Sequence, residues 1–454
     1  MTRHSGFLMG CAAALVAATS AGAQQTMPPV RPLGPIEHVS ASNLRSVASV
    51  RELPGRRLLV NDIVNHRVLL LDSTLTTVKV VADSTASTAN AYGNRPGGLL
   101  PYKGDSTLFI DPASLSMLVL DGTGQVARVM AVPNPNEAMF LIGGPFGNPG
   151  FDPSGKLVFR GMENRMMPPP KGADMKTFVP QFPDSAPIVR VNLADRAEDT
   201  VAYFKLPPTK MQITRTENGM IGQSIINPMP MVDDWALLSD GTVAVVRGRD
   251  FHIDWYHPDG THTSSAKIPF DWQRLTDSLK KFVLDSAKQV MEQRRAERMA
   301  MLDSTRKLAG GGNERTVRAG DASGGAAAEM GAMVMVLRSR AGGGDGGAAP
   351  PMRGTTTAPT LPPFEFVPPY ELPDYRPAFT TGASKADTHG NLWIRTTDAK
   401  DGRPVYDVVN EQGTLIDRVQ LPPFRTIAGF GDGVVYMGVV DATGAVHLER
   451  ARIR

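Results

Sequence analysis

The chain contains 454 residues, of which 41% are apolar and 20% charged, and its formal net charge is +3. These values are typical of a globular protein. Segment 273–353 alone carries 14 basic and 9 acidic residues, so the positive charge is concentrated there. Nucleic-acid binding needs basic residues clustered on a folded face, and no apolar run after the first residues reaches the roughly 18 residues of a membrane span. We therefore expect neither a nucleic-acid partner nor a membrane span.

Residues 1–23 predict a signal peptide. A polar start is followed by an apolar run at 7–18 and then by small residues, which favours cleavage after Ala23. The single cysteine, Cys11, lies within this segment, so the mature chain has no disulfide. We expect a secreted or periplasmic protein in which residues 24–35 form an N-terminal extension.

The next feature is a repeated unit, in which an apolar run, a tight polar turn and a second apolar run follow one another. The first copies extend from Gly55 to Asp72 and from Gly104 to Asp121, and their glycines are 49 residues apart. Later copies open after Ser-Gly, Asp-Gly or His-Gly turns, at Gly155, Gly241, Gly390 and Gly433. A period of about 40–50 residues with strand-like content is the signature of a β-propeller. The sequence predicts an all-β, six-bladed β-propeller.

Long spacings in the repeat set the domain boundaries. We assign blades 1–4 to residues 36–269 and blades 5–6 to residues 379–454, separated by an insertion at 270–378. The last blade has only three predicted strands, which would leave an exposed sheet edge. Residues 36–41 are therefore predicted to close the sixth blade beside 446–453.

The insertion between blades 4 and 5 has three predicted parts. Residues 272–307 have apolar positions near a 3.6-residue period and predict a helix. Residues 309–360 are rich in Gly and Ala, so we expect disorder and a dispensable segment, with at most weak docking of the apolar run 333–337. Residues 361–377 carry six prolines and predict an extended strap.

Long connections are predicted to lie on one face of the propeller. Successive hairpins alternate between the two ends of a blade, so the connections at 82–98, 162–186, 207–229 and 270–378 share one end. Loops on a rigid scaffold are where binding and catalytic residues tend to lie. This long-loop face is therefore the candidate functional face. The alternative is that insertions accumulate wherever they are tolerated.

The repeated Gly-x-Leu-(Val/Leu)-Val…Val-Leu-Asp units, with the segment from Asp233 to Asp254, resemble the six-bladed NHL/TolB-like propellers, and more narrowly the secreted bacterial proteins of that type. The resemblance implies relatives such as gluconolactonase-like hydrolases, which hold a divalent ion on carboxylates and an Asn, and amidating lyases, which bind metal through histidines. Neither ligand set maps onto this sequence residue by residue.

Polar residues in the predicted loops of blades 1, 2 and 4 could converge at the mouth of the central channel and hold a polar ligand. They are Asn61, Asp62, His66, Asp111, Arg247, Arg249 and Asp250. The alternative interpretation is that Asn and Asp side chains cap turns. His252 and Asp254 are weak candidates for metal ligands, but no complete ligand set is visible.

Two functions are consistent with these features. The first is a monomeric binding module that takes up a small polar ligand, a glycan or a protein on the long-loop face. The second is a lactonase-like, metal-assisted hydrolase or lyase with a divalent ion at the channel mouth. The sequence contains no G-x-S-x-G, H-E-x-x-H or Walker motif, which favours the binding module, for which we expect no cofactor.

Overall fold

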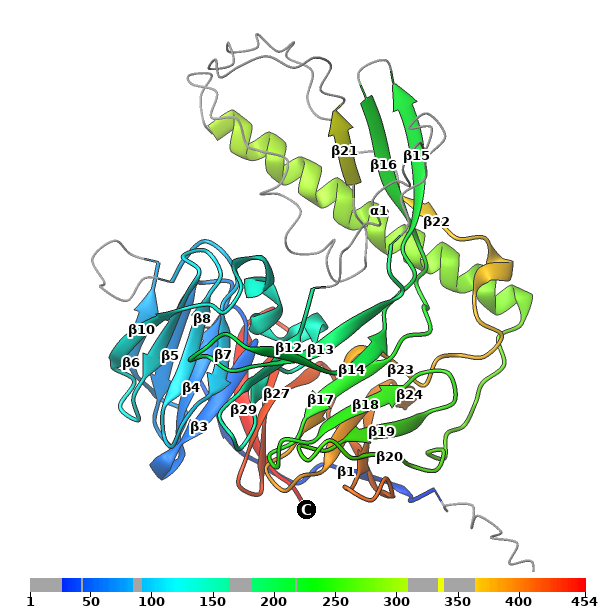
Figure 1. Ribbon diagram of the computed structural model, residues 1–454. Coiled ribbons are helices and arrows are strands. Elements are labelled where there is room, and N and C mark those ends of the chain that lie inside the picture. The colour runs from blue at the N-terminus through cyan, green and yellow to red at the C-terminus, as the bar shows by residue number, and fades with distance from the viewer. Residues whose placement is uncertain are drawn as a thin grey trace, which may run out of the picture.

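The computed structural model describes residues 27–41, 44–84, 92–162, 182–216, 219–308, 334–338 and 364–454. The predicted signal peptide at 1–23 and most of the segment 309–360, predicted to be disordered, lie outside these residues. Within them the fold is mostly β, built of four-stranded antiparallel sheets in a propeller-like arrangement (Figure 1).

Three such sheets follow in chain order from the N-terminal half. The first contains β3 (Ser49–Leu53), β4 (Arg57–Asp62), β5 (Arg67–Leu71) and β6 (Thr77–Asp83). The second contains β7 (Gly98–Pro101), β8 (Thr107–Asp111), β9 (Ser116–Leu120) and β10 (Val126–Ala131). The third contains β11 (Gly150–Phe151), β12 (Leu157–Arg160), β13 (Ser185–Val191) and β14 (Glu198–Lys205).

Three further sheets complete the propeller-like part. One contains β17 (Asp234–Leu237), β18 (Val243–Arg247), β19 (His252–Tyr256) and β20 (His262–Ser264). The next contains β23 (Phe379–Ala386), β24 (Leu392–Lys400), β25 (Arg403–Val409) and β26 (Leu415–Gln420). The last contains β27 (Arg425–Gly431), β28 (Val434–Val440), β29 (Val446–Arg452) and β2 (Ile36–Val39).

Strands from both ends of the chain meet in the last two sheets. β2 pairs antiparallel with β29. This pairing was predicted, because three strands alone would leave an exposed edge on the last sheet. β1 (Val30–Pro32) pairs in parallel with β26 and widens that sheet to five strands. The sequence analysis assigned these three residues to an N-terminal extension. Arg31 holds them there, because its Nε donates to Asp417 Oδ1 at 2.8 Å.

The hydrophobic core lies between neighbouring sheets. Six clusters of buried residues each combine side chains from two sheets that follow one another in the chain, or from the last sheet and the first. In the cluster that joins the ends, Tyr436 and Leu448 pack with Leu58 and Leu69. Because each sheet buries both faces against neighbours, the strands read as near-continuous apolar runs.

The predicted helix of the insertion is present but begins later than expected. α1 extends over Asp277–Leu308, whereas the periodicity placed its start at residue 272. The preceding backbone is paired with the Pro-rich strap instead, since Leu275 N–H donates to Asp374 O at 2.8 Å and Arg274 forms a bridge with Tyr375. Among the described residues, no helix is long and apolar enough to cross a membrane.

A seventh sheet stands beside α1, above the propeller-like sheets in Figure 1. It contains β15 (Lys210–Thr216), β16 (Gly219–Ile226), β21 (Val334–Arg338) and β22 (Glu365–Phe366). The crossing predicted at 207–229 thus contains a hairpin, and the backbone of β21 pairs with β16, in the region where the sequence analysis allowed the apolar run 333–337 to dock. The strap contains β22 and one short 3-10 helix, η4 (Pro369–Glu371).

Candidate functional site

The residues predicted to bind a ligand in the first sheet hold the following crossing in place. Asn61 Nδ2 donates to Gly97 O at 2.8 Å, and Tyr92 Oη donates to Asn61 Oδ1 at 3.0 Å. His66 lies edge-on to the Tyr92 ring, with the ring centroids 5.4 Å apart. Burial raises the pKa of Tyr92 to about 12, so this hydroxyl stays protonated at neutral pH.

Two of the residues predicted to bind a ligand are carboxylates with partners inside the protein. Asp111 accepts from Ala113 N–H at 3.1 Å and from the Ser114 hydroxyl at 2.5 Å, which is the turn-capping interpretation. Asp62 instead accepts from the backbone N–H of Ser46, before β3, at 3.0 Å and pairs with Arg67 Nε at 3.1 Å. A ligand-binding role for either carboxylate remains a prediction.

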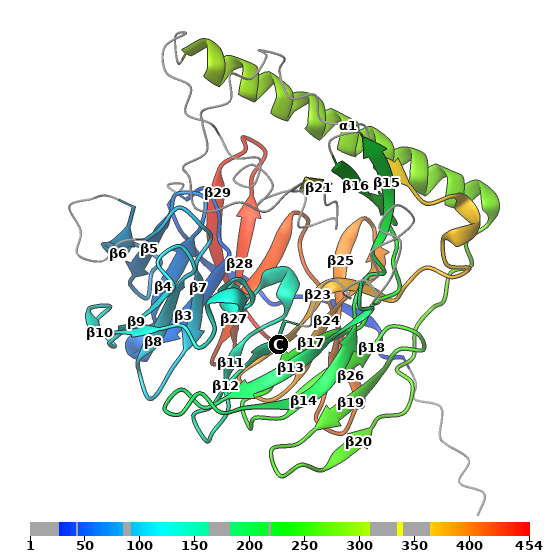
Figure 2. The same cartoon turned by 45° about the horizontal axis from the view of Figure 1, so that its top comes forward.

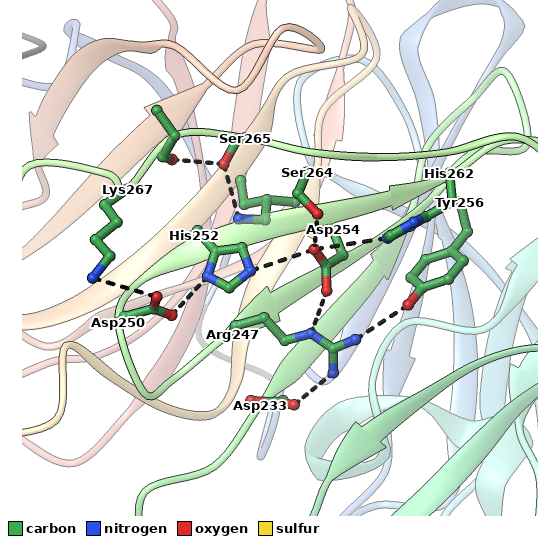
Figure 3. Close-up of polar contacts among 12 residues, drawn as sticks. Asp233, Arg247, Asp250, His252, Asp254, Tyr256, His262, Ser264, Ser265 and Lys267 are labelled. Carbon is green, nitrogen blue, oxygen red and sulfur yellow. Dashed lines mark hydrogen bonds and ion pairs between the residues drawn. The ribbon is translucent and has the colours of Figure 1, made fainter. Parts of the chain in front are cut away.

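The predicted residues of the fourth sheet form a network around Arg247, at the end of β18 (Figure 3). Its Nη1 donates to Asp233 Oδ2 at 2.8 Å and its Nε to Asp254 Oδ2 at 2.6 Å. Nη1 also donates to Tyr203 O on β14, at 3.0 Å. Burial by itself would lower the pKa of Arg247, but the hydrogen bonds and charges of the two carboxylates raise it. The network therefore joins two neighbouring sheets.

His252 lies between two carboxylates of the same network. Its Nδ1 is 2.6 Å from Asp250 Oδ1 and its Nε2 is 3.4 Å from Asp254 Oδ1, while His262 Nε2 is 3.8 Å from the same oxygen. Figure 3 shows the two imidazoles on opposite sides of the Asp254 carboxylate. In the part of the chain that the structure describes, no three His, Cys, Asp or Glu side chains form a group that could hold a metal ion.

Arg249 differs from its neighbours, because it is exposed and no described residue forms an ion pair or side-chain hydrogen bond with it. The other six predicted ligand-binding residues fall into two sets, one around Tyr92 and Asp111 and the other around Arg247. Among the described residues, no hydrogen bond or ion pair links the two sets.

A loop that the sequence analysis did not single out crosses the centre of the molecule. It follows η2 (Pro135–Ile142) and includes η3 (Gly144–Phe146). We call residues 143–149 the axial loop. Figure 2 shows the teal segment around residues 135–146 among β7, β11, β23 and β27. Its sequence, Gly-Gly-Pro-Phe-Gly-Asn-Pro, is the one signal that could have drawn attention to it.

The axial loop contacts the innermost strands of two other sheets. Asn148 Nδ2 donates to Ser384 O of β23 at 2.5 Å, and Trp235 Nε1 of β17 donates to Phe146 O at 3.3 Å. At Gly147, whose φ is +96°, a Cβ would lie 2.2 Å from Trp235 Nε1. Only glycine fits such a close approach. The loop therefore packs directly on both strands.

Beneath this loop a buried carboxylate joins the same two strands. Asp234 of β17 is 2% exposed and accepts from the backbone N–H groups of Ser384 at 2.7 Å and Gly382 at 3.2 Å. Burial raises the pKa of Asp234 to about 6, although these hydrogen bonds lower it. Burial also lowers the pKa of Lys385, whose Nζ donates to Asn148 Oδ1 at 3.4 Å.

α1 presents apolar side chains on two of its sides. Leu284 and Met291 are buried, and Leu284 packs with Val367 and Leu372 of the strap. A different side carries Leu279, Phe282 and Val290, which are 45%, 68% and 46% exposed. We call these three residues the exposed apolar face of α1. Their spacing places them on one side of the helix.

The sequence matches no protein-family model and no curated protein. Similar solved structures include a member of the DUF4221 family from Bacteroides vulgatus, with a TM-score of 0.42 and 7% identity over 95% of this chain and 98% of that one. A virginiamycin B lyase from Staphylococcus aureus has a TM-score of 0.36 and 10% identity, over 92% and 99%. A gluconolactonase from Xanthomonas campestris has a TM-score of 0.35 and 12% identity, over 94% and 99%. These values are too low for any inference about activity.

Proposed function

We propose that this protein is an exported binding module, built on a six-bladed NHL/TolB-like propeller, that docks a partner protein on its long-loop face. The six clusters of buried residues support the blade number, because each joins one sheet to the next and one joins the last sheet to the first. The predicted signal peptide supports export.

The exposed apolar face of α1 is the observation that favours a protein as the partner. Phe282 leaves 68% of its surface in contact with water, although α1 already buries another side against the strap. Grouped exposed apolar side chains commonly mark protein interaction sites, and aromatic residues are the usual anchors of such sites. The helix stands on the same side of the propeller-like sheets as the β15–β16 hairpin (Figure 1).

A small polar ligand is less well supported by the residues predicted to bind it. Asp62 and Asp111 accept hydrogen bonds from other parts of the protein, and Arg247 is matched by two carboxylates. A ligand would have to replace these contacts, which costs free energy unless the new hydrogen bonds are equally good. A partner that binds the exposed apolar face of α1 does not have to replace any of these hydrogen bonds.

Site-specific photo-cross-linking in the native host tests the proposal. A photoreactive phenylalanine analogue at position 282 should form a discrete adduct with one partner protein. The matched control places the same analogue at Val129, which is 60% exposed on the outer strand β10 and should give no such adduct.

A second substitution removes the apolar anchor without disturbing the buried side of α1. Leu279→Ser together with Val290→Ser should abolish the adduct at position 282, because both residues share its exposed face. No adduct at 282, or the same adducts at 282 and 129, would contradict a docking site on α1.

A further inference from the structure

We propose that Asn148 of the axial loop and Lys385 of β23 form a covalent amide cross-link at the centre of the molecule. The two side chains are already in contact, since Lys385 Nζ donates to Asn148 Oδ1 at 3.4 Å, and they lie 237 residues apart in the sequence. The axial loop leads directly into β11, so the bond links the sheets of β11 and β23, which do not follow one another in the chain.

The side-chain amide of Asn148 is held in one orientation. Its Nδ2 donates to Ser384 O at 2.5 Å, so its Oδ1 is the atom that faces Lys385. The next residue is Pro149, which has no backbone N–H. Asparagine usually loses ammonia when the next backbone nitrogen attacks the side-chain amide, and a proline blocks that route. The Lys385 amine is therefore the nucleophile in contact with this amide.

Lys385 has the environment of a nucleophilic amine. Its side chain is partly buried, and among the described residues no carboxylate lies within ion-pair distance of its Nζ. Burial lowers the pKa of Lys385 and thereby raises the fraction of the neutral amine. Only the neutral amine has a lone pair that attacks a carbonyl carbon. The contact with Asn148 and the burial of the amine favour the same reaction.

Asp234 of β17 lies beside the two reacting groups. Its carboxylate accepts from Ser384 N–H at 2.7 Å, while Asn148 donates to the C=O of the same residue. The N–H and C=O groups of one residue in an extended strand point to the same edge, so the Asp234 and Asn148 side chains are neighbours there. The charge of Asp234 also acts on Lys385. Asp234 is therefore the base of the proposed step.

The step conserves all atoms and needs no other reactant. Asp234 accepts one proton from the Lys385 ammonium group, and the Nζ lone pair attacks Cγ of Asn148. The Nζ–Cγ bond forms and the Cγ–Nδ2 bond breaks, while a second Nζ proton moves to Nδ2, which leaves as ammonia. Ammonia then takes the proton from Asp234 and departs as ammonium.

The cross-link supplies a covalent staple to a chain that has no other. The predicted mature chain contains no cysteine, so it has no disulfide. A bond between residues 148 and 385 closes a long loop, and closure of a long loop removes much conformational entropy from the unfolded chain. The bond also fixes the axial loop to the innermost strand β23.

Tandem mass spectrometry of a tryptic digest of the purified mature protein detects the bond directly. We expect a branched peptide that joins the two segments, lighter than their sum by one ammonia molecule, with no cleavage after Lys385. The branch must be located, because cyclisation of an N-terminal glutamine gives the same change in intact mass. Two unlinked peptides, with Asn148 intact and cleavage after Lys385, would overturn the proposal without any variant.

A conservative substitution then tests the nucleophile. Lys385→Arg keeps the positive charge but has no primary amine, so it should give no branched peptide and should melt at a lower temperature than the wild type. It should also run more slowly than the wild type in a denaturing gel, because a chain with a closed loop is more compact. Lys210→Arg is the matched control, since Lys210 is exposed and pairs with Glu371, and it should keep the branched peptide. Equal gel mobility of Lys385→Arg and the wild type would contradict the cross-link.

A second variant tests the base. Asp234→Asn keeps an acceptor for Ser384 N–H but takes up no proton at neutral pH. A folded Asp234→Asn protein, checked by thermal unfolding, should yield the Asn148 and Lys385 peptides unlinked. A branched peptide at the wild-type yield would show that Asp234 is not the base and would refute the step as written.

Discussion

Arg247 Nη1 donates to Asp233 Oδ2 at 2.8 Å and thereby joins the end of β18 to the residue before β17. The same carboxylate accepts from Lys205 N–H at 3.0 Å, at the end of β14 in the preceding sheet. One aspartate therefore connects two sheets, and Arg247 neutralises its charge.

The first prediction concerns the stability of this junction. Arg247→Met should lower the free energy of unfolding by roughly 2–3 kcal/mol, because it leaves Asp233 and Asp254 without their cation in a partly buried site. Arg249→Met is the matched control, two residues away and exposed, and should change stability by no more than about 0.5 kcal/mol. Denaturant unfolding of both variants checks the prediction, and equal effects would show that the network adds nothing to stability.

A second prediction tests the close packing of the axial loop. Gly147→Ala should destabilise the protein by roughly 2–4 kcal/mol, because the new methyl group meets the buried Trp235 ring and the residue has a positive φ. Gly144 also has a positive φ, of +68°, but no atom lies within 4 Å of its Cβ. Gly144→Ala should cost only about 1 kcal/mol. Thermal unfolding that ranks Gly144→Ala as the more harmful change would contradict this packing.

The pH dependence of stability gives a third prediction. Burial raises the pKa of Asp407 to about 6, although the charge and hydrogen bond of Arg418 lower it. The folded state then binds the proton more tightly than the unfolded state, so this stabilisation is complete below about pH 4 and is lost as the pH rises to 6. Relative to the wild type, the free energy of unfolding of Asp407→Asn should therefore rise by up to about 3 kcal/mol between pH 4 and pH 7.

An aspartate with the opposite shift provides the control for this series. Hydrogen bonds from the Gln125 N–H and the Thr123 hydroxyl lower the pKa of Asp121. Its contribution to stability is present above the pKa of the unfolded state and falls as the pH drops. The free energy of unfolding of Asp121→Asn should therefore fall relative to that of the wild type from pH 4 to pH 7. Urea unfolding at both pH values measures the two trends, and the same sign for both would contradict the assignment.

A fourth prediction separates the two N-terminal strands. A chain that begins at Gly34 lacks β1 but keeps β2, whereas a chain that begins at Ser46 lacks both. Loss of β2 exposes the backbone edge of β29 beside the buried Leu448, so the shorter chain should unfold at a much lower temperature. The chain beginning at Gly34 loses the buried Leu33 as well as β1, so it should melt below the full mature protein but well above the shorter chain. Equal melting temperatures for the two truncations would show that β2 does not contribute to closure.

The hairpin turns were readable from the sequence because their hydrogen bonds are local. Asp121 Oδ1, for example, accepts from the N–H groups of Thr123 at 2.8 Å and Gln125 at 2.9 Å. All three residues lie within five positions, so the Asp-Gly-Thr pattern predicts the contact. The pairing of β2 with β29 came from a general argument about unpaired edges, since the local apolar pattern of β2 is weak.

The start of α1 shows why local periodicity is insufficient elsewhere. Leu275 continues the apolar spacing of the helix, but its backbone N–H pairs with Asp374 O, a hundred residues away. The antiparallel bridge between Arg274 and Tyr375 shows that this segment is extended against the strap, so the helix begins only after it. The sequence pattern contains no information about that partner.

The sequence by itself determined where the apolar runs and polar turns of this protein lie, because strands and hairpins depend mainly on neighbouring residues. The tertiary structure alone decided which polar side chains meet. Asn148 reaches Ser384, and Arg247 rather than Arg249 is matched by carboxylates. Such hydrogen bonds need donor and acceptor within about 3 Å, a precision that arises only when sheets distant in the sequence pack against one another.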